Sequence, residues 1–139
     1  MSLYDTLLLL HVLSAFLVVG ALAALWALVL GTRDPAPVLS PESGVRFGRV
    51  AGTLVGVGLV GAIAFGIWLA LDIDGFELWD PWILASLVLW GLATWAGTQS
   101  GKAFATDPVG RRRDGIRLQA LNSVAVLVIL VLMIWKPGA

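Results

Sequence analysis

The only histidine, His11, lies near the start of an apolar stretch and is the residue best suited to chemistry. It follows Asp5 by six residues, about 9 Å along a helix at 1.5 Å per residue. An ionisable side chain at such depth in a membrane is costly, which makes it a functional-site hypothesis. Three interpretations stay open. The neutral imidazole could hydrogen-bond to Ser86 or a backbone carbonyl, it could bind a metal such as haem iron, or it could relay protons.

Residues at the depth of His11 are predicted by counting six positions inward from the outer end of each apolar run. The count gives Phe65 and Gly66 in the second run, Ser86 in the third and Ile129 in the fourth. Met133 lies slightly nearer the outer surface. If His11 holds haem b, then Met133, a histidine of another copy or no residue would be the second axial ligand. We therefore name His11 as a metal ligand, and His11, Gly66, Ser86 and Met133 as cofactor-binding residues.

Other kinds of site are excluded or disfavoured by the residue types present. The chain has no cysteine, which removes disulfides, thiolate metal sites and iron–sulfur clusters. One histidine and two methionines are too few for a copper-handling site. The carboxylates between Asp72 and Asp80 are better explained as a solvated acidic loop than as a cation site. No catalytic set and no phosphate-binding loop is present, so no catalytic residue is assigned.

The composition is that of a membrane protein. Hydrophobic residues make up 59% of the chain, charged residues 13%, and the mean hydropathy is +0.93. A soluble fold of 139 residues could not bury so much apolar surface, so the lipid bilayer is the expected partner. The net charge of zero gives no basic surface for nucleic acid.

Four charge-free runs predict four transmembrane helices. Each run is close to the roughly 20 residues that a spanning helix needs. The pairs Ser40-Pro41, Asp80-Pro81 and Asp107-Pro108 are typical helix starts. We expect an all-α, four-helix transmembrane bundle forming a single domain over residues 1–139. Its helices are predicted at about 6–30, 42–71, 81–103 and 108–135.

The distribution of charge predicts the orientation. Eight of the nine basic residues lie near the loops after the first and third runs, and only Lys136 lies on the other side. Basic loops stay in the cytoplasm. The chain is therefore predicted to form two antiparallel helical hairpins in the bacterial inner membrane, with both termini extracytoplasmic.

Small residues recur at intervals of four in two of the runs, which allows close helix contacts. The second run carries Gly52 and Gly56, followed by Gly58, Ala62 and Gly66. The third run carries a similar series that ends at Gly101. Packing within one bundle is the simpler interpretation. A homo-oligomer seam, or a contact with a partner subunit, is the alternative. Near the inner end of the fourth run, the polar residues Gln119, Asn122 and Ser123 are expected to face protein rather than lipid.

The segment from Leu9 to Gly20 reads LLHVLSAFLVVG and resembles the first helix of a bacterial membrane protein group. The group includes copper-resistance D proteins, HemJ-type protoporphyrinogen oxidases and small four-helix relatives, and the last of these are the most similar in layout. The resemblance implies a haem contact at His11. The chain departs from the enzymes because its runs hold no lysine and no second histidine.

These features favour a non-enzymatic membrane protein with a haem b or metal contact at His11. A membrane redox enzyme of porphyrin metabolism is one alternative. A small metal-ion or proton transporter that uses His11 and the outer carboxylates is another. A bound chromophore would favour the first two, substrate turnover would separate them, and ion flux would favour the third.

Overall fold

The computed structural model describes residues 1–31, 41–72, 77, 79–106, 110 and 112–136, and the regular elements there are all α-helices. They are α1 (Leu3–Gly31), α2 (Pro41–Asp72), α3 (Pro81–Thr106) and α4 (Arg112–Trp135). All four are long and apolar enough to cross a membrane. The prediction of an all-helical chain with four membrane-length helices is thus confirmed. The expected helix starts at Ser40 and at Asp107-Pro108 lie outside the described residues.

The beginnings of α1 and α3 follow from local hydrogen bonds. Ser2 Oγ accepts from the Asp5 backbone N–H at 3.1 Å, and Asp5 Oδ2 accepts from the Ser2 backbone N–H at 3.1 Å. This reciprocal pair is a capping box, which satisfies donors that a helix start leaves open. Asp80 directly precedes Pro81 at the start of α3, and its backbone carbonyl accepts from the Ile83 and Leu84 N–H groups at 3.0 and 3.1 Å. Its carboxylate accepts instead from the Glu77 backbone N–H, before the helix, at 3.3 Å.

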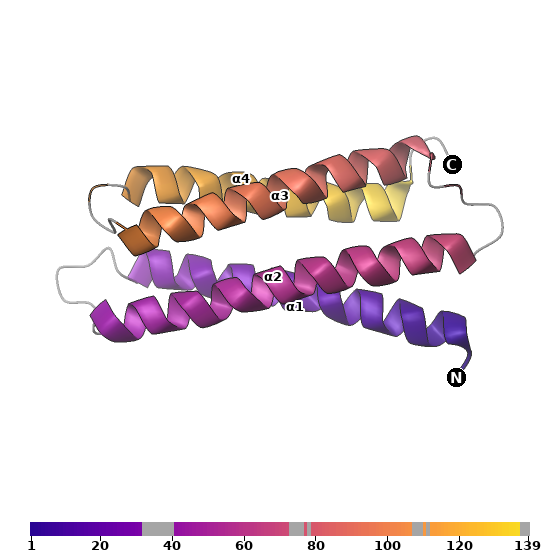
Figure 1. Cartoon of the computed structure of the whole chain (residues 1–139), viewed down its shortest axis with the longest axis horizontal. Helices are drawn as coiled ribbons and strands as arrows, with labels where there is room; N and C mark the ends of the chain where they lie inside the picture. The colour runs from indigo at the N-terminus through magenta and orange to yellow at the C-terminus, as the bar shows by residue number, and fades with distance from the viewer. Residues whose placement is uncertain (32–40, 73–76, 78, 107–109, 111, 137–139) are drawn as a thin grey trace.

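The helices form two closely packed pairs. α1 packs along α2 and α3 packs along α4, while the pairs meet mainly through α2 and α3 (Figure 1). Contact between α1 and α4 is much less extensive. The start of α1 and the end of α4 lie at the same end of the bundle (Figure 1).

The interior is narrow and is built largely from small and aliphatic side chains. Its buried cluster consists of Val18, Ala21, Leu22, Val55, Leu59, Ala93, Ala125 and Val126. Large apolar side chains also point outward: Phe16 is 75% exposed, Val88 73% and Ile134 85%. A surface this apolar would be unfavourable in water, and four such helices are compatible with a small integral membrane protein.

Two tryptophans link the helix pairs by hydrogen bonds. The Trp90 indole N–H on α3 donates to the Leu59 carbonyl of α2 at 3.0 Å. The Trp26 indole N–H on α1 donates to Ser123 Oγ of α4 at 2.8 Å. An indole suits this role because its apolar body packs in the core while its N–H finds an acceptor. These bonds connect pairs that otherwise touch over a limited area.

Candidate functional site

His11 lies in the first half of α1 and turns its ring towards α2. The imidazole is half-buried, and Nδ1 lies 2.9 Å from the Ala62 carbonyl oxygen. A carbonyl can only accept, so Nδ1 is the donor. In the neutral ring Nε2 then holds the free lone pair. One hydrogen bond therefore sets both the direction of the ring and its tautomer.

Gly66 makes room for the imidazole on the α2 side. A Cβ atom at this position would stand 3.0 Å from His11 Cε1 and 3.2 Å from His11 Nδ1. Both distances are tighter than ordinary van der Waals contact, so the ring lies directly against the bare backbone. The structure thus brings together two of the residues predicted for the site, His11 and Gly66.

The contact between α1 and α2 continues from His11 towards the C-terminal end of α1, through Ser14 and Val18. A Cβ atom at Gly61 would stand 2.5 Å from Ser14 Oγ, and one at Gly58 would stand 2.6 Å from Val18 Cγ2. Such spacing is possible only because α2 presents glycine where α1 presents side chains. The close approach holds His11 within reach of the Ala62 carbonyl.

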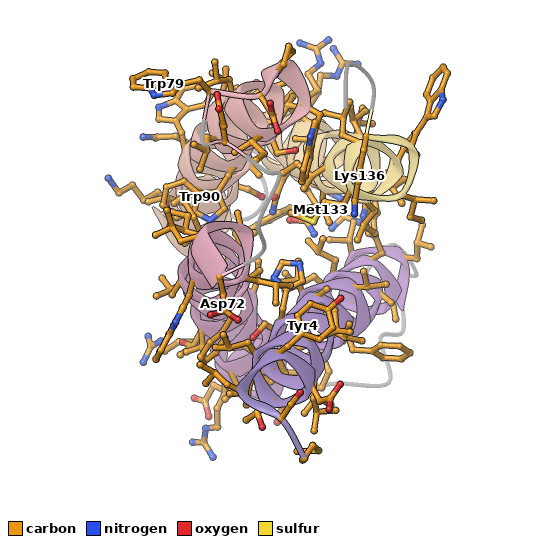
Figure 2. The ribbon with its side chains drawn as sticks, turned by 90° about the vertical axis from the view of Figure 1, so that its right-hand side faces the viewer. Tyr4, Asp72, Trp79, Trp90, Met133 and Lys136 are labelled. Carbon is orange, nitrogen blue, oxygen red and sulfur yellow. The ribbon has the colours of Figure 1, made fainter. Side chains whose placement is uncertain are left out.

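Ser86 and Met133, the other predicted site residues, lie on the opposite helix pair. Ser86 on α3 is buried, and its hydroxyl donates to the Trp82 carbonyl of the same helix at 2.8 Å. Met133 is half-buried on the side of α4 that faces α1 and α2 (Figure 2). Neither forms a hydrogen bond to His11 within the described ranges. The structure therefore does not join them to His11.

Nε2 of His11 is the atom of this site that could bind a ligand or a metal ion. It forms no hydrogen bond with the residues that the structure describes, and it is not among their fully enclosed nitrogens. Those residues also contain no group of three or more His, Cys, Asp or Glu side chains that could hold a metal ion. Asp74 of the acidic loop lies outside the described residues. What the geometry offers is one oriented imidazole ligand, the arrangement used to hold haem iron, rather than a closed tetrahedral site.

The Ala62 carbonyl is the functional partner that residue types alone miss. A backbone acceptor has no signature of its own, because every residue carries one. The available signal was indirect: Ala62 precedes Gly66 by one helical turn, in a series of small residues expected to pack closely. Such a series indicates that backbone will be exposed to a neighbouring helix, but not which carbonyl will accept.

Two further polar side chains, Gln119 and Asn122, are buried in the core towards the other end of the bundle. Gln119 and Asn122 on α4 are only 3% and 1% exposed, as expected for side chains that face protein. Asn122 packs against Gly97 of α3, where a Cβ atom would stand 3.0 Å from Nδ2. Gln119 Nε2 and Asn122 Oδ1 are enclosed and lack a hydrogen-bond partner among the described residues. Buried polar atoms without partners destabilise a fold.

Asn122→Leu is accordingly expected to raise the free energy of unfolding by about 1–2 kcal/mol, since an unsatisfied buried polar group costs about 1–3 kcal/mol. The measurement is a denaturation curve of the detergent-solubilised protein. Ser123→Ala is the matched control one residue away. It removes the acceptor of the Trp26 indole, so it should destabilise by about 1 kcal/mol. A clear loss of stability in Asn122→Leu would mean that the amide is satisfied in the folded protein.

Comparison with known proteins gives no further information on the family or the function of this chain. No family model, curated protein or solved structure matches this chain. The family resemblance of the segment from Leu9 to Gly20 therefore stays a prediction. Function has to be argued from the geometry around His11 itself.

Proposed function

We propose that this chain is a non-enzymatic, multi-pass protein of the bacterial inner membrane that binds haem b through Nε2 of His11. The single observation that carries the proposal is the 2.9 Å hydrogen bond from His11 Nδ1 to the Ala62 carbonyl. Metal-binding histidines almost always donate their other ring N–H to a backbone carbonyl, a carboxylate or water. That bond fixes the tautomer and makes the free nitrogen a better ligand.

The proposed topology has two antiparallel hairpins with both chain ends extracytoplasmic. It is supported by four helices of membrane length and by the basic residues that gather near two of the loops. His11 lies nearer the start of α1 than its end, so in the proposed topology the site belongs to the outer half of the membrane.

The chain's own residues fit a haem contact in three ways. Gly66 lets the imidazole rest on α2, the Ala62 carbonyl orients it, and Nε2 stays free of hydrogen bonds to the described residues. Haem, when bound, supplies one-electron chemistry or a binding place for a small gas. Because the described residues contain no group of three or more His, Cys, Asp or Glu side chains, we assign the protein the role of a haem-carrying subunit, alone as an oligomer or with a membrane partner.

The test is the visible spectrum of the detergent-purified protein after haem supplementation, oxidised and then reduced with dithionite. We expect a Soret band with reduced α and β bands, lost in His11→Ala. Free imidazole should restore the band in that variant, which separates a lost ligand from a lost fold. Ser86→Ala is the control and should keep the band, because its hydroxyl bonds within α3. Met133→Leu should change the spectrum only if methionine is the second ligand.

The contrary outcomes are distinct. No Soret band at any haem loading of the folded wild-type protein would overturn the haem site, leaving His11 as a helix-packing contact or a proton-transfer group. An unchanged band in His11→Ala would assign haem to other residues. Turnover of a porphyrinogen by the haem-loaded protein would make it an enzyme. Ion flux in proteoliposomes that depends on His11 would make it a transporter.

A further inference from the structure

The hydrogen bonds that the structure describes between α1 and α4 both lie in one half of the bundle. The Trp26 indole N–H donates to Ser123 Oγ at 2.8 Å, and the Arg112 guanidinium donates to the Val29 carbonyl at 2.7 Å. We call these two the inner bonds, and the end where α1 finishes and α4 begins the inner end. Towards the opposite, outer end, in the half of α1 that contains His11, α1 diverges from α4 (Figure 1).

Exposure along one side of α1 agrees with this divergence. At 3.6 residues per turn, four residues lie within about 40° of one another around the helix: Leu8, Val12, Val19 and Trp26. We call them the α4-facing strip, because Trp26 reaches α4 from it. Trp26 is half-buried, whereas Val19, Val12 and Leu8 are 42%, 45% and 37% exposed. A helix packed along the whole of the strip would cover these side chains, so α4 leaves the strip beyond Trp26.

α4 shows the same change of exposure on the side that carries Ser123. Leu127 and Ile134 follow Ser123 by four and eleven residues, so all three lie on one side of the helix. Ser123 is half-buried, but Leu127 is 59% and Ile134 85% exposed. Leu130, between them, still packs against the buried cluster. The side of α4 that accepts from Trp26 is thus largely uncovered towards the outer end.

His11 lies at the edge of this uncovered region. It follows Leu8 by three residues, which puts it about 60° around α1 from Leu8, on the side of α2. Its Nδ1 is held by the Ala62 carbonyl, and its Nε2 forms no hydrogen bond with the described residues. Met133 is half-buried on the side of α4 that faces α1 and α2 (Figure 2). The candidate site therefore borders the place where the two helix pairs part.

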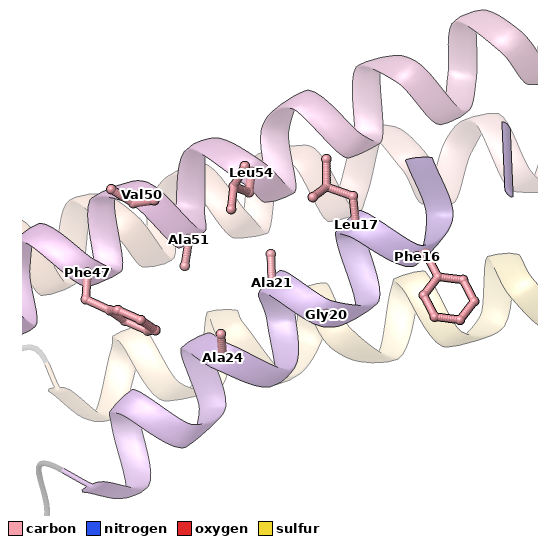
Figure 3. Close-up of a pocket in the computed structure, with 9 residues that line it drawn as sticks. All are labelled: Phe16, Leu17, Gly20, Ala21, Ala24, Phe47, Val50, Ala51 and Leu54. Carbon is pink, nitrogen blue, oxygen red and sulfur yellow. The ribbon is translucent and has the colours of Figure 1, made fainter. Parts of the chain in front are cut away.

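Each helix pair is held together more firmly than the two pairs are held to each other. α1 meets the bare backbone of α2 at Gly58 and Gly66. Further along, Ala21 and Ala51 are buried and point into the space between the two helices, beside the pocket drawn in Figure 3. Besides the inner bonds, the pairs are linked by the bond from Trp90 of α3 to α2. A movement of α1 against α4 must therefore carry α2 with it.

From this arrangement we propose that the two helix pairs form a hinge, held by the inner bonds and free where the outer halves of α1 and α4 part. Haem bound to His11 fixes the separation of these outer halves. A ligand shifts a conformational equilibrium only through contacts that differ between the states. Contact of the haem with α4 near Met133 supplies that difference, because the bond from His11 to Ala62 lies within one pair. The role of haem rests on the proposed function, whereas the hinge itself does not.

The experiment measures distances between two spin labels on the full chain by pulsed electron paramagnetic resonance. The chain has no cysteine, so labels attach only to introduced ones. Exposed positions on α1 and α4 carry them: Leu9→Cys with Val131→Cys as the outer pair, and Leu30→Cys with Arg113→Cys as the inner pair. Zinc protoporphyrin, a diamagnetic analogue of haem, is the probe, and its binding is followed by absorption.

Without the porphyrin, the outer distance distribution should be about 3 Å broader than the inner one, because a rotation of about 20° moves α1 that far at the roughly 9 Å spacing of packed helices. Addition of the porphyrin should narrow the outer distribution to the width of the inner one. The inner distribution should stay unchanged.

The inner bonds have their own variant and control. The double variant Arg112→Gln, Ser123→Ala removes both bonds and should broaden the inner distribution to the width of the outer one. The control is the double variant Arg117→Gln, Thr98→Ala. Arg117 is exposed on α4 and the Thr98 hydroxyl bonds within α3, so the control should leave both distributions unchanged.

The contrary results separate the hinge from the haem site. Equal widths of the two distributions without the porphyrin would overturn the hinge. A bound porphyrin that leaves the outer distribution broad would mean that the ligand contacts one helix pair only, which would overturn its role in fixing the hinge. A broad outer distribution with no porphyrin binding at any concentration would remove the proposed haem site and support the hinge alone.

Discussion

Gly58→Ala is expected to lower the free energy of unfolding by about 3 kcal/mol, the upper end of the usual range for an extra group in a packed interior. A Cβ atom there would stand 2.6 Å from Val18 Cγ2, 2.9 Å from the Ser14 carbonyl oxygen and 3.1 Å from the Val18 backbone nitrogen. Two of these atoms belong to backbone, which no rotamer change can move. Val18 is β-branched and stiff as well. The variant can therefore fold only if α1 shifts away from α2.

Gly56→Ala is the matched control, two residues earlier on the same helix. Nothing lies within 4 Å of a Cβ atom at this position. The substitution should be neutral or slightly stabilising, since alanine favours helix over glycine by about 1 kcal/mol. Denaturation curves of both variants in one detergent make the comparison. If the two variants unfold at the same midpoint, α1 and α2 do not pack in this register.

The same substitution links helix packing to the candidate site. His11, Ser14 and Val18 occupy one side of α1, and all three face small residues of α2. A shift that relieves the clash at Gly58 would lengthen the hydrogen bond from His11 to Ala62. If haem binds at His11 as proposed, we therefore expect Gly58→Ala to weaken that binding as well, whereas Gly56→Ala should not.

The helices were predictable because the signals that define them are local. A run of apolar residues between charges marks a membrane helix, whatever it packs against. The pair Asp80-Pro81 marks the start of α3 to the residue. These signals lie within a few positions of one another, so they do not depend on how distant segments meet.

The candidate site was predictable only in part, because counting residues gives depth and not direction. Gly66 was expected at the depth of His11, and its backbone does meet the imidazole. Ser86 was expected at the same depth, but its hydroxyl bonds to Trp82 within its own helix. Whether a residue at the right depth meets His11 depends on how its helix is rotated about its own axis. The packing of the four helices decides that rotation, and the sequence does not show it.

Rotation also explains why the glycines of α2 divide into two groups. Gly58 and Gly66 meet α1, as packing within the bundle predicts, whereas Gly52 and Gly56 meet nothing within 4 Å. Gly56 and Gly58 are only two positions apart, which puts them roughly on opposite sides of a helix with 3.6 residues per turn. The sequence shows two series of small residues but not which one faces the partner helix.

Trp90→Ala is expected to destabilise the protein by about 3 kcal/mol, the lower end of the range for truncating a buried aromatic side chain. Trp90 packs against the buried cluster and donates its indole N–H to the Leu59 carbonyl at 3.0 Å. It thus supplies both packing and a hydrogen bond at the contact of α2 with α3. Since the two helix pairs meet mainly there, the loss should separate the pairs before either pair unfolds.

Two further variants divide this effect into its parts. Trp90→Phe keeps an aromatic ring but loses the donor, so it should cost about 1 kcal/mol, the typical net value of one hydrogen bond. Trp95→Ala removes a tryptophan of the same helix that is 53% exposed, and should change stability little. Denaturation curves measure the stability of each variant. Proteolysis between the helix pairs tests whether the pairs separate before either of them unfolds. If Trp95→Ala costs as much as Trp90→Ala, the outer side of α3 is itself packed against protein. In that case α3 forms a subunit contact, and the pairs are held together by assembly rather than by the indole of Trp90.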